Sequence, residues 1–332
     1  MRKIFLYFIS NILCAAAFTQ HISNSDLKIL QQKEDSIKVY ADKIVTGQSV
    51  SIRFNNDSLF TRGFVKALKT PNSFYYPFDS LQTISKLYAP DSSFRIFTWQ
   101  MVVSDNLTRQ HGAIQMRTAD GSLKIFPLID KSDVTTGIAD TAANNKGWIG
   151  AVYYRIIEKR SSNINYYTLL GYDENNLKSN RKIIEVLSFA NDEPMFGGRF
   201  FSYEADSVFK SSTSRYVMEY KKSAGARLAY DDDMDMIILE HLESETGEPL
   251  KKWTYIPDGD YEGFKWNNGK WVHIEKVFHQ ITELGKEPVP APVKDAQGNT
   301  IEEKLKDNTP TEPPTEEQPG TQKPAKKPKS KN

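Results

Sequence analysis

The chain has 332 residues, of which 39% are hydrophobic and 12% aromatic, and these fractions are enough to build a folded core. The formal net charge is +1 at pH 7, and the body between residues 20 and 284 is close to neutral. This balance excludes the basic footprint of a protein that binds nucleic acid. The only cysteine is Cys14, so the sequence offers no disulfide framework and no cysteine-based metal site.

The first residues have the pattern of an export signal. Arg2 and Lys3 form a short basic start, residues 4–18 carry no charge, and this apolar run ends in Ala15-Ala16-Ala17. The run is too short to span a bilayer as a permanent helix. We therefore predict a signal peptide at residues 1–19, a periplasmic or secreted protein, and no transmembrane segment after cleavage.

Cys14 offers an alternative, because a cysteine near the end of a signal can become a lipid attachment site. That processing requires a small residue immediately before the cysteine, and here Leu13 is bulky. We therefore interpret Cys14 as one more apolar residue of the signal.

Residues 20–93 are predicted to form an N-terminal helical segment. Apolar residues recur at helical spacing in residues 25–45, where Ser25 is suited to cap the first turn. A second helix is predicted over residues 57–68, and a short third one over residues 80–88.

Residues 94–284 are predicted to form an antiparallel β domain. All five tryptophans lie in this part of the chain, and turn residues recur about every ten positions with no long helical pattern between them. Expected strands cover residues 94–103, 113–117, 123–126, 148–157, 166–172, 182–189, 199–203, 216–220, 227–230, 236–241, 252–256, 261–266 and 271–277. The predicted fold class is therefore mainly β (α+β), with N-terminal helices packed on an antiparallel sheet domain as one cooperative unit.

The last segment, residues 285–332, is predicted to be a disordered tail. It contains nine of the sixteen prolines and no aromatic residue, so it lacks the apolar surface needed to offset the entropy of ordering. Its end, residues 323–331, has five lysines and no acid, which is compatible with a solvated tail or with an electrostatic tether to an anionic surface.

The densest group of acidic residues follows Tyr230. Asp231, Asp233 and Asp235 stand close together, and carboxylates at this spacing repel unless they are paired, protonated or bound to a hard cation. These three residues form a hypothetical calcium site, and calcium is the only cofactor that the sequence suggests. The alternative is a solvated turn between two strands.

A second acidic stretch and the histidines give weaker indications. Asp258 to Gly263 resembles the start of a calcium loop, but Gly269 stands where a bidentate glutamate belongs. His111, His241 and His273 do not have the spacing of a zinc protease, so each is interpreted as structural.

Three strings carry a resemblance to a known group of proteins: residues 166–173, residues 182–187 and residues 257–264. They resemble uncharacterised secreted proteins of Bacteroidetes-type bacteria, over roughly residues 94–277. The resemblance implies an exported protein and brings no catalytic or binding residue.

No catalytic motif was found among the nucleophile, phosphate-binding and dinucleotide-binding patterns. The leading functional hypothesis is therefore a non-catalytic protein that binds or scaffolds an envelope component of unknown identity. The alternative is a secreted hydrolase in which two of Asp231, Asp233 and Glu240 act as acid and base.

The export signal leads to the first prediction. Cleavage between Ala17 and Gln20 should leave a mature chain in the periplasm or medium, because the small residues of the cleavage zone end there. N-terminal sequencing of the mature protein checks this. An intact Met1 in a cytosolic fraction would contradict it, and a lipid on Cys14 would contradict only the soluble state.

Overall fold

The computed structural model describes residues 22–203 and 213–278. The predicted signal peptide and the predicted tail lie outside these residues. The chain divides after His279, and all described residues belong to the first of its two units. This unit is mainly β, with antiparallel sheets and two long helices, which confirms the predicted fold class. In the described part, neither helix is long and apolar enough to cross a membrane.

The two helices are α2 (Asn24–Thr46) and α3 (Val50–Leu68), and both begin at serine caps. The Ser23 side chain accepts a hydrogen bond from the amide of Asp26, and the Ser49 side chain does the same for Ile52. Helix α2 matches its predicted range, but its cap is Ser23 and not the predicted Ser25. Helix α3 begins seven residues earlier than predicted. Its first turns are exposed, so they do not show the apolar periodicity on which the prediction rested.

The predicted third helix at residues 80–88 is wrong. Residues Ser85–Tyr88 form strand β1, which pairs with β2 (Phe94–Ser104) in an antiparallel ladder. The backbone of a four-residue segment obtains more hydrogen bonds from a neighbouring strand than from a single helical turn, so the tertiary partner decides its conformation.

A buried arginine holds the irregular loop that precedes β1. Arg95 is fully buried, and its guanidinium donates to the carbonyls of Ser73 and Tyr76 at 2.7 and 2.6 Å and to Gln115 Oε1 at 2.9 Å. The guanidinium carbon also lies 4.6 Å from the centre of the Phe97 ring. Burial lowers the pKa of Arg95 to about 10.

The strands form three sheets. The first has the order β1-β2-β3-β4, the second β5-β9-β8-β7-β6 with β11 also paired to β8, and the third β10-β15-β14-β13-β12. The first sheet adds β3 (Leu107–Met116) and β4 (Lys124–Ile129). The second contains β5 (Ala143–Asn144), β6 (Val152–Ser161), β7 (Ile164–Asp173), β8 (Ser179–Ala190), β9 (Glu193–Phe196) and β11 (Arg215–Lys221). The third contains β10 (Phe201–Ser202), β12 (Leu228–Asp231), β13 (Met236–Ser244), β14 (Tyr255–Asn267) and β15 (Lys270–Ile274).

Several predicted strand bounds are wrong. Strand β3 begins at Leu107 instead of residue 113, and the strands predicted at residues 252–256 and 261–266 belong to one strand, β14. Residues 148–151 precede β6, and the buried Trp148 donates its indole N–H to the Tyr153 hydroxyl at 2.6 Å. Residues Lys252–Thr254 form a short 3-10 helix, η3, before β14 begins. Trp148 forms an isolated bridge with Asp130 and not a ladder, and η3 has no buried residue, so strand-forming side chains alone did not make either segment a strand.

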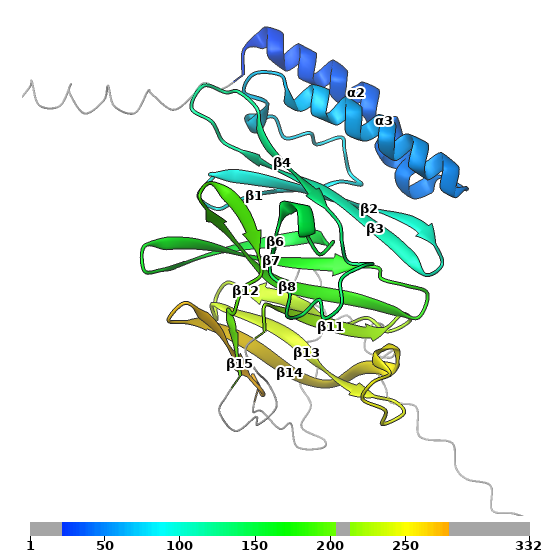
Figure 1. Ribbon diagram of the computed structural model, residues 1–332, viewed down its shortest axis with the longest axis vertical. Coiled ribbons are helices and arrows are strands. Elements are labelled where there is room, and N and C mark those ends of the chain that lie inside the picture. The colour runs from blue at the N-terminus through cyan, green and yellow to red at the C-terminus, as the bar shows by residue number, and fades with distance from the viewer. Residues whose placement is uncertain (1–21, 204–212, 279–332) are drawn as a thin grey trace, which may run out of the picture. The chain divides into compact units, whose positions relative to one another are not determined.

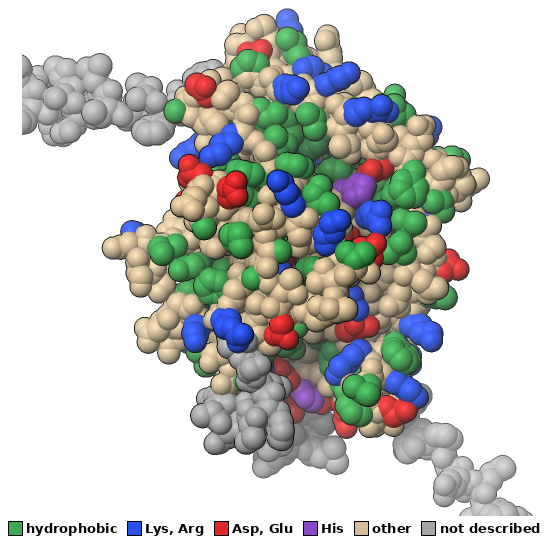
Figure 2. Space-filling model, viewed as in Figure 1, with side chains coloured by type: hydrophobic (Ala, Val, Ile, Leu, Met, Phe, Trp, Pro, Cys, Tyr) green, Lys and Arg blue, Asp and Glu red, His purple; other side chains and the backbone are tan. Residues whose placement is uncertain are grey.

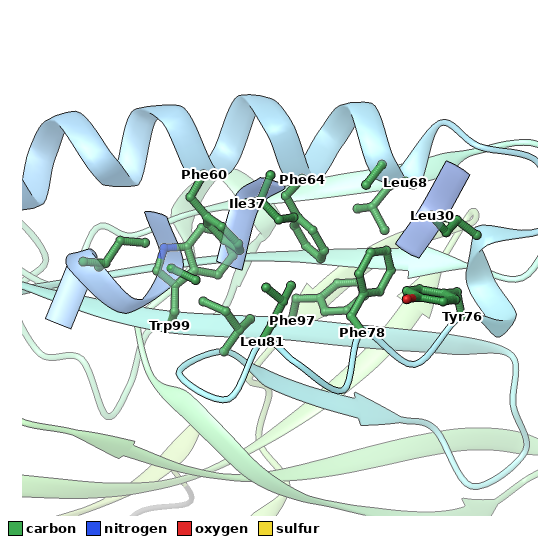
Figure 3. Packing of buried hydrophobic residues seen from close by; sticks show 14 of the residues in the cluster. Leu30, Ile37, Phe60, Phe64, Leu68, Tyr76, Phe78, Leu81, Phe97 and Trp99 are labelled. Atoms are coloured by element: carbon green, nitrogen blue, oxygen red, sulfur yellow. The ribbon is translucent and has the colours of Figure 1, made fainter. Parts of the chain in front are cut away.

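The helices and the three sheets form four layers with three cores between them (Figure 1). Strand β2 is apolar on both faces because it lies between two of these cores. Phe97 and Trp99 face the helices, where they meet Phe60 and Phe64 (Figure 3), whereas Ile96 faces the second sheet. The second sheet is covered on both faces in the same way, so every residue from Tyr167 to Gly171 of β7 is buried.

A buried ion pair lies in the second sheet. Glu185 on β8 and Arg215 on β11 are directly opposite each other in the ladder, and both side chains are fully buried. Arg215 donates to Glu185 Oε2 through Nε and Nη2 at 3.0 and 2.8 Å. Its Nη1 donates to the carbonyls of Ile138 and Thr141 at 2.5 and 2.6 Å, and the Tyr153 hydroxyl donates to Glu185 Oε1.

This pair leads to the second prediction. Glu185→Ala should lower the free energy of unfolding by about 3–5 kcal/mol, because it leaves the Arg215 cation buried without its carboxylate. Urea unfolding followed by tryptophan fluorescence measures the change. Glu243→Gln, at an exposed position of β13, is the control and should change the free energy by less than about 0.5 kcal/mol. A loss of the same size in both variants would contradict the role of the pair.

Candidate functional site

The acidic residues predicted as a calcium site lie on the turn between β12 and β13. Asp231 Oδ1 accepts hydrogen bonds from the amides of Asp233 and Met234 at 3.0 and 2.9 Å, so this carboxylate closes the turn. Asp235 bonds to Lys159 and to the Tyr230 hydroxyl. These contacts hold the pKa of Asp235 below its usual range.

The structure therefore brings Asp231, Asp233 and Asp235 close together at one turn, and Asp231 and Asp235 have hydrogen-bonding partners within the chain. Among residues 22–203 and 213–278, no group of three or more His, Asp or Glu side chains is arranged to hold a metal ion. Glu240 accepts a hydrogen bond from the amide of Arg227 at 2.5 Å instead of pairing with these aspartates. The turn thus has neither a formed cation cage nor the paired carboxylates that the hydrolase alternative requires.

Polar side chains converge instead in a cleft between the second and third sheets, with a volume of about 470 Å³. One wall comes from β8 and β11, and the other from β13, β14 and the short helix η3. The lining residues are Ile138, Arg181, Tyr203, Tyr216, Val217, Met218, Glu219, His241, Leu242, Lys252, Tyr255 and Glu262. We call this feature the tyrosine cleft.

A β-bulge places His241 in the tyrosine cleft. The register between β13 and β14 shifts between Glu240 and Leu242, and His241 lies at the irregular position. Its Nδ1 lies 2.6 Å from Asp258 Oδ2. Burial opposes ionisation of Asp258, but hydrogen bonds from the Asp260 amide and from His241 hold its pKa below the usual value. The stretch that resembled a calcium loop thus orients a histidine.

The same wall continues this row of polar contacts to a second histidine. Glu262 Oε2 lies 2.7 Å from Nε2 of the buried His273, and Glu262 Oε1 lies 3.5 Å from Nε2 of His241. Two imidazoles and two carboxylates, from Asp258 to His273, therefore form a row from the cleft into the protein. Such a row fixes ring orientations and holds its charges in place.

The opposite wall is organised around Arg181 on β8. Its Nε donates to Glu219 Oε2 at 2.8 Å, and its Nη1 lies 4.0 Å from Asp173 Oδ2. The Ser179 hydroxyl also donates to Glu219, at 2.6 Å. Burial is the main influence on Asp173 and raises its pKa to about 6, even though the amide of Asn175 and the side chain of Gln110 donate to it.

Two tyrosines of the cleft, Tyr203 and Tyr216, are neutral hydrogen-bonding groups with apolar rings. Burial raises the pKa of Tyr203 and of Tyr216 above the usual value, so both phenols keep their protons at neutral pH. The ammonium of Lys252 lies 4.1 Å from the centre of the Tyr255 ring. The cleft thus presents aromatic faces and fixed polar groups, which is the composition of a binding site for a polar ligand.

Sequence reasoning missed a second site at His111. Asp57 Oδ1 lies 2.8 Å from Trp99 Nε1 and 2.8 Å from His111 Nδ1. The carboxylate holds the imidazole ring, whose side chain is 26% exposed between two surface hollows of about 370 and 390 Å³. Figure 2 shows a histidine surrounded by Lys and Arg side chains in the upper half and another beside acidic side chains in the lower half.

One signal in the sequence points to the His111 site. Asp57 lies on the same helical face as Phe60 and Phe64, at spacings of three and seven residues. A carboxylate on an apolar helix face needs a buried donor, and that requirement marks Asp57 as unusual. Its partner is on β3, more than fifty positions further along the chain, and only the fold identifies it.

The third prediction follows from the raised pKa of Asp173. A carboxyl whose pKa is higher in the folded than in the unfolded protein stabilises the fold at low pH, and this contribution is lost as the pH rises from about 4 to 6. Asp173→Asn mimics the protonated form. The free energy of unfolding of the variant relative to the native chain should therefore rise by on the order of 1–3 kcal/mol between pH 4 and pH 7.

Urea unfolding at both pH values measures this difference. Asp260→Asn, at an exposed position of β14, is the control and should show a difference that does not change with pH. If the difference for Asp173→Asn is equally constant, the carboxyl does not titrate in this window.

Comparisons with protein-family models, with curated proteins and with solved structures find no match. The resemblance to secreted Bacteroidetes-type proteins therefore stays a prediction. Any function has to be argued from the geometry of the tyrosine cleft and of the His111 site.

Proposed function

We propose that this chain is an exported, non-catalytic binding protein of the periplasm or the extracellular space, and that the tyrosine cleft is its ligand site. The export part rests on the signal pattern at residues 1–19. The binding part rests on one observation, the convergence of tyrosines and fixed polar side chains in a cleft of about 470 Å³ between two sheets. The ligand is an envelope component.

The state of the polar side chains favours binding over catalysis. Arg181 is paired with Glu219, and His241 lies against Asp258. Groups held by such partners keep one orientation, so they recognise a ligand at a low entropic cost. A hydrolase needs an acid and a base turned toward the same bond. The carboxylates in the cleft instead contact the cations and imidazoles of the protein.

The walls also indicate the class of ligand. Two cationic side chains, Arg181 and Lys252, and the hydroxyl-bearing rings of Tyr203, Tyr216 and Tyr255 face the same space. Such a surface suits a ligand with hydrogen-bond acceptors and some apolar surface, because tyrosine offers both a ring face and a polar tip. A purely apolar ligand would leave these polar groups without partners.

Capture from envelope extracts tests this function and is the fourth prediction. The mature chain, immobilised, should retain a partner that His241→Ala captures at least about tenfold less well, because the variant removes a fixed group from the cleft wall. Mass spectrometry of the eluate measures the retained partner. His111→Ala is the matched control, since this histidine lies outside the cleft and should leave capture unchanged. Equal capture by both variants would contradict the choice of site.

A second arm separates the calcium hypothesis from the cleft. Capture is repeated with calcium and with a chelator, and with the double variant Asp231→Asn, Asp233→Asn. Dependence on calcium that disappears in the double variant would assign binding to the acidic turn. If capture is the same with calcium and with the chelator, Asp231 only closes the turn through its hydrogen bonds.

A further inference from the structure

One edge of the second sheet opens into the tyrosine cleft. Strand β11 pairs with β8 on one side, and among the described strands nothing pairs with its other side. Four consecutive residues of β11, from Tyr216 to Glu219, line the cleft. A lining made of consecutive strand residues includes the backbone as well as alternate side chains, so the edge itself forms part of the wall.

The ladder shows which backbone groups of β11 face the cleft. The register pairs Val217 with Ile183. One position beyond the end of this ladder, Lys222 lies opposite Lys178, and its N–H donates to the Lys178 carbonyl at 2.8 Å. In an antiparallel pair, the residues that exchange hydrogen bonds alternate with residues that do not. The residues bonded to β8 are therefore the even-numbered ones, such as Met218. Val217 and Glu219 turn their N–H and C=O groups away from β8.

The two ends of this edge are closed, and its middle is open. Arg215 N–H donates to the carbonyl of Ala139 at 2.9 Å, and the Lys221 carbonyl accepts from Ala224 N–H at 3.0 Å. Between them, the outward backbone groups of Val217 and Glu219 have no backbone partner within residues 22–203 and 213–278. Two N–H and two C=O groups, about 7 Å apart along the strand, are thus presented to the cleft.

We propose that the tyrosine cleft binds an extended peptide segment of a partner protein, which adds to the second sheet as a strand beside β11. The inference rests on the proposed function, and it assigns the class of ligand. Four backbone groups in alternating donor and acceptor order match the groups of one extended chain and nothing smaller. A strand in this position satisfies the edge, which otherwise carries unpaired backbone groups.

The side walls define what such a peptide carries. Successive side chains of an added strand point to opposite faces, so every second residue meets the third sheet, where Leu242 and Tyr255 offer an apolar surface and a ring beside Tyr216 of β11. The residues between them face the side of Arg181, whose guanidinium is already paired with Glu219. The expected ligand is therefore an unfolded segment with apolar or aromatic residues at every second position.

Amide exchange in the free, full-length protein gives the first test and the fifth prediction. The amides of Val217 and Glu219 should exchange at least about tenfold faster than those of Met218 and Tyr220, which are bonded to β8. NMR-detected hydrogen exchange measures all four. Protection of Val217 and Glu219 equal to that of their neighbours would overturn the proposal, because the edge would then already be paired.

A matched pair of variants tests the edge with a defined probe. Linear nine-residue peptides are selected from a random display library on the mature chain, and the tightest is titrated. Val217→Pro removes an N–H that points into the cleft and breaks no bond to β8, whereas Val217→Ala keeps it. Loss of this hydrogen bond should weaken the peptide about tenfold in the proline variant only. Equal affinities in the two variants would overturn strand addition.

The probe itself can be altered where the proline variant does not fold. Methylation of alternate backbone nitrogens of the peptide removes its donors, and only one of the two alternating sets should matter if it pairs with β11. Indifference to both sets overturns the proposal. If capture of the partner still requires His241, the proposed function holds and the ligand belongs to another class. If capture does not require His241, the cleft is not the binding site. An increase in the mass of the protein in solution through contacts at this edge would show that the occupant is a second copy of the chain. That result would likewise overturn the proposal.

Discussion

The buried pair of Glu185 and Arg215 is the interaction on which the candidate site depends. Arg215 is the first residue of β11, and its guanidinium reaches both the carboxylate opposite it on β8 and two carbonyls of the loop between β4 and β5. A fully buried cation is costly unless every donor has a partner, so this strand can occupy only one position. The edge of β11 and the wall of the tyrosine cleft follow from that position.

The same principle recurs at the other interfaces of the molecule. Arg95 is buried among aromatic rings and satisfied by carbonyls and an amide, and Asp57 is buried with two donors on neighbouring strands. Each joins elements that are distant in the sequence and excludes alternative registers, because a shift by one residue would leave a buried polar group without a partner. Apolar packing holds the layers together, and these polar contacts select their alignment.

The tyrosine cleft combines two kinds of order. Its side chains are fixed in pairs, which prepares a recognition surface, whereas the middle of the β11 edge keeps backbone groups that a ligand can satisfy. A sheet normally covers such an edge or places charges on it. Here the edge lines a cleft between two sheets.

Local patterns in the sequence were sufficient for the helices at residues 25–45 and 57–68 and for most strands, because helix caps and the alternation of apolar residues act over a few positions. The same patterns failed at residues 80–88, where a strand partner outweighed helical spacing. The candidate site could not be predicted in this way. His241, Glu262 and Arg181 are ordinary residues in the sequence. A β-bulge, the pairing of β13 with β14 and the ladder between β8 and β11 bring them to one cleft. The sequence by itself determined the elements and the classes of residue that each carries. Only the tertiary structure decided which of them meet, because a contact between distant strands depends on register and on buried polar pairing, and the local sequence does not identify the partner of a buried polar residue.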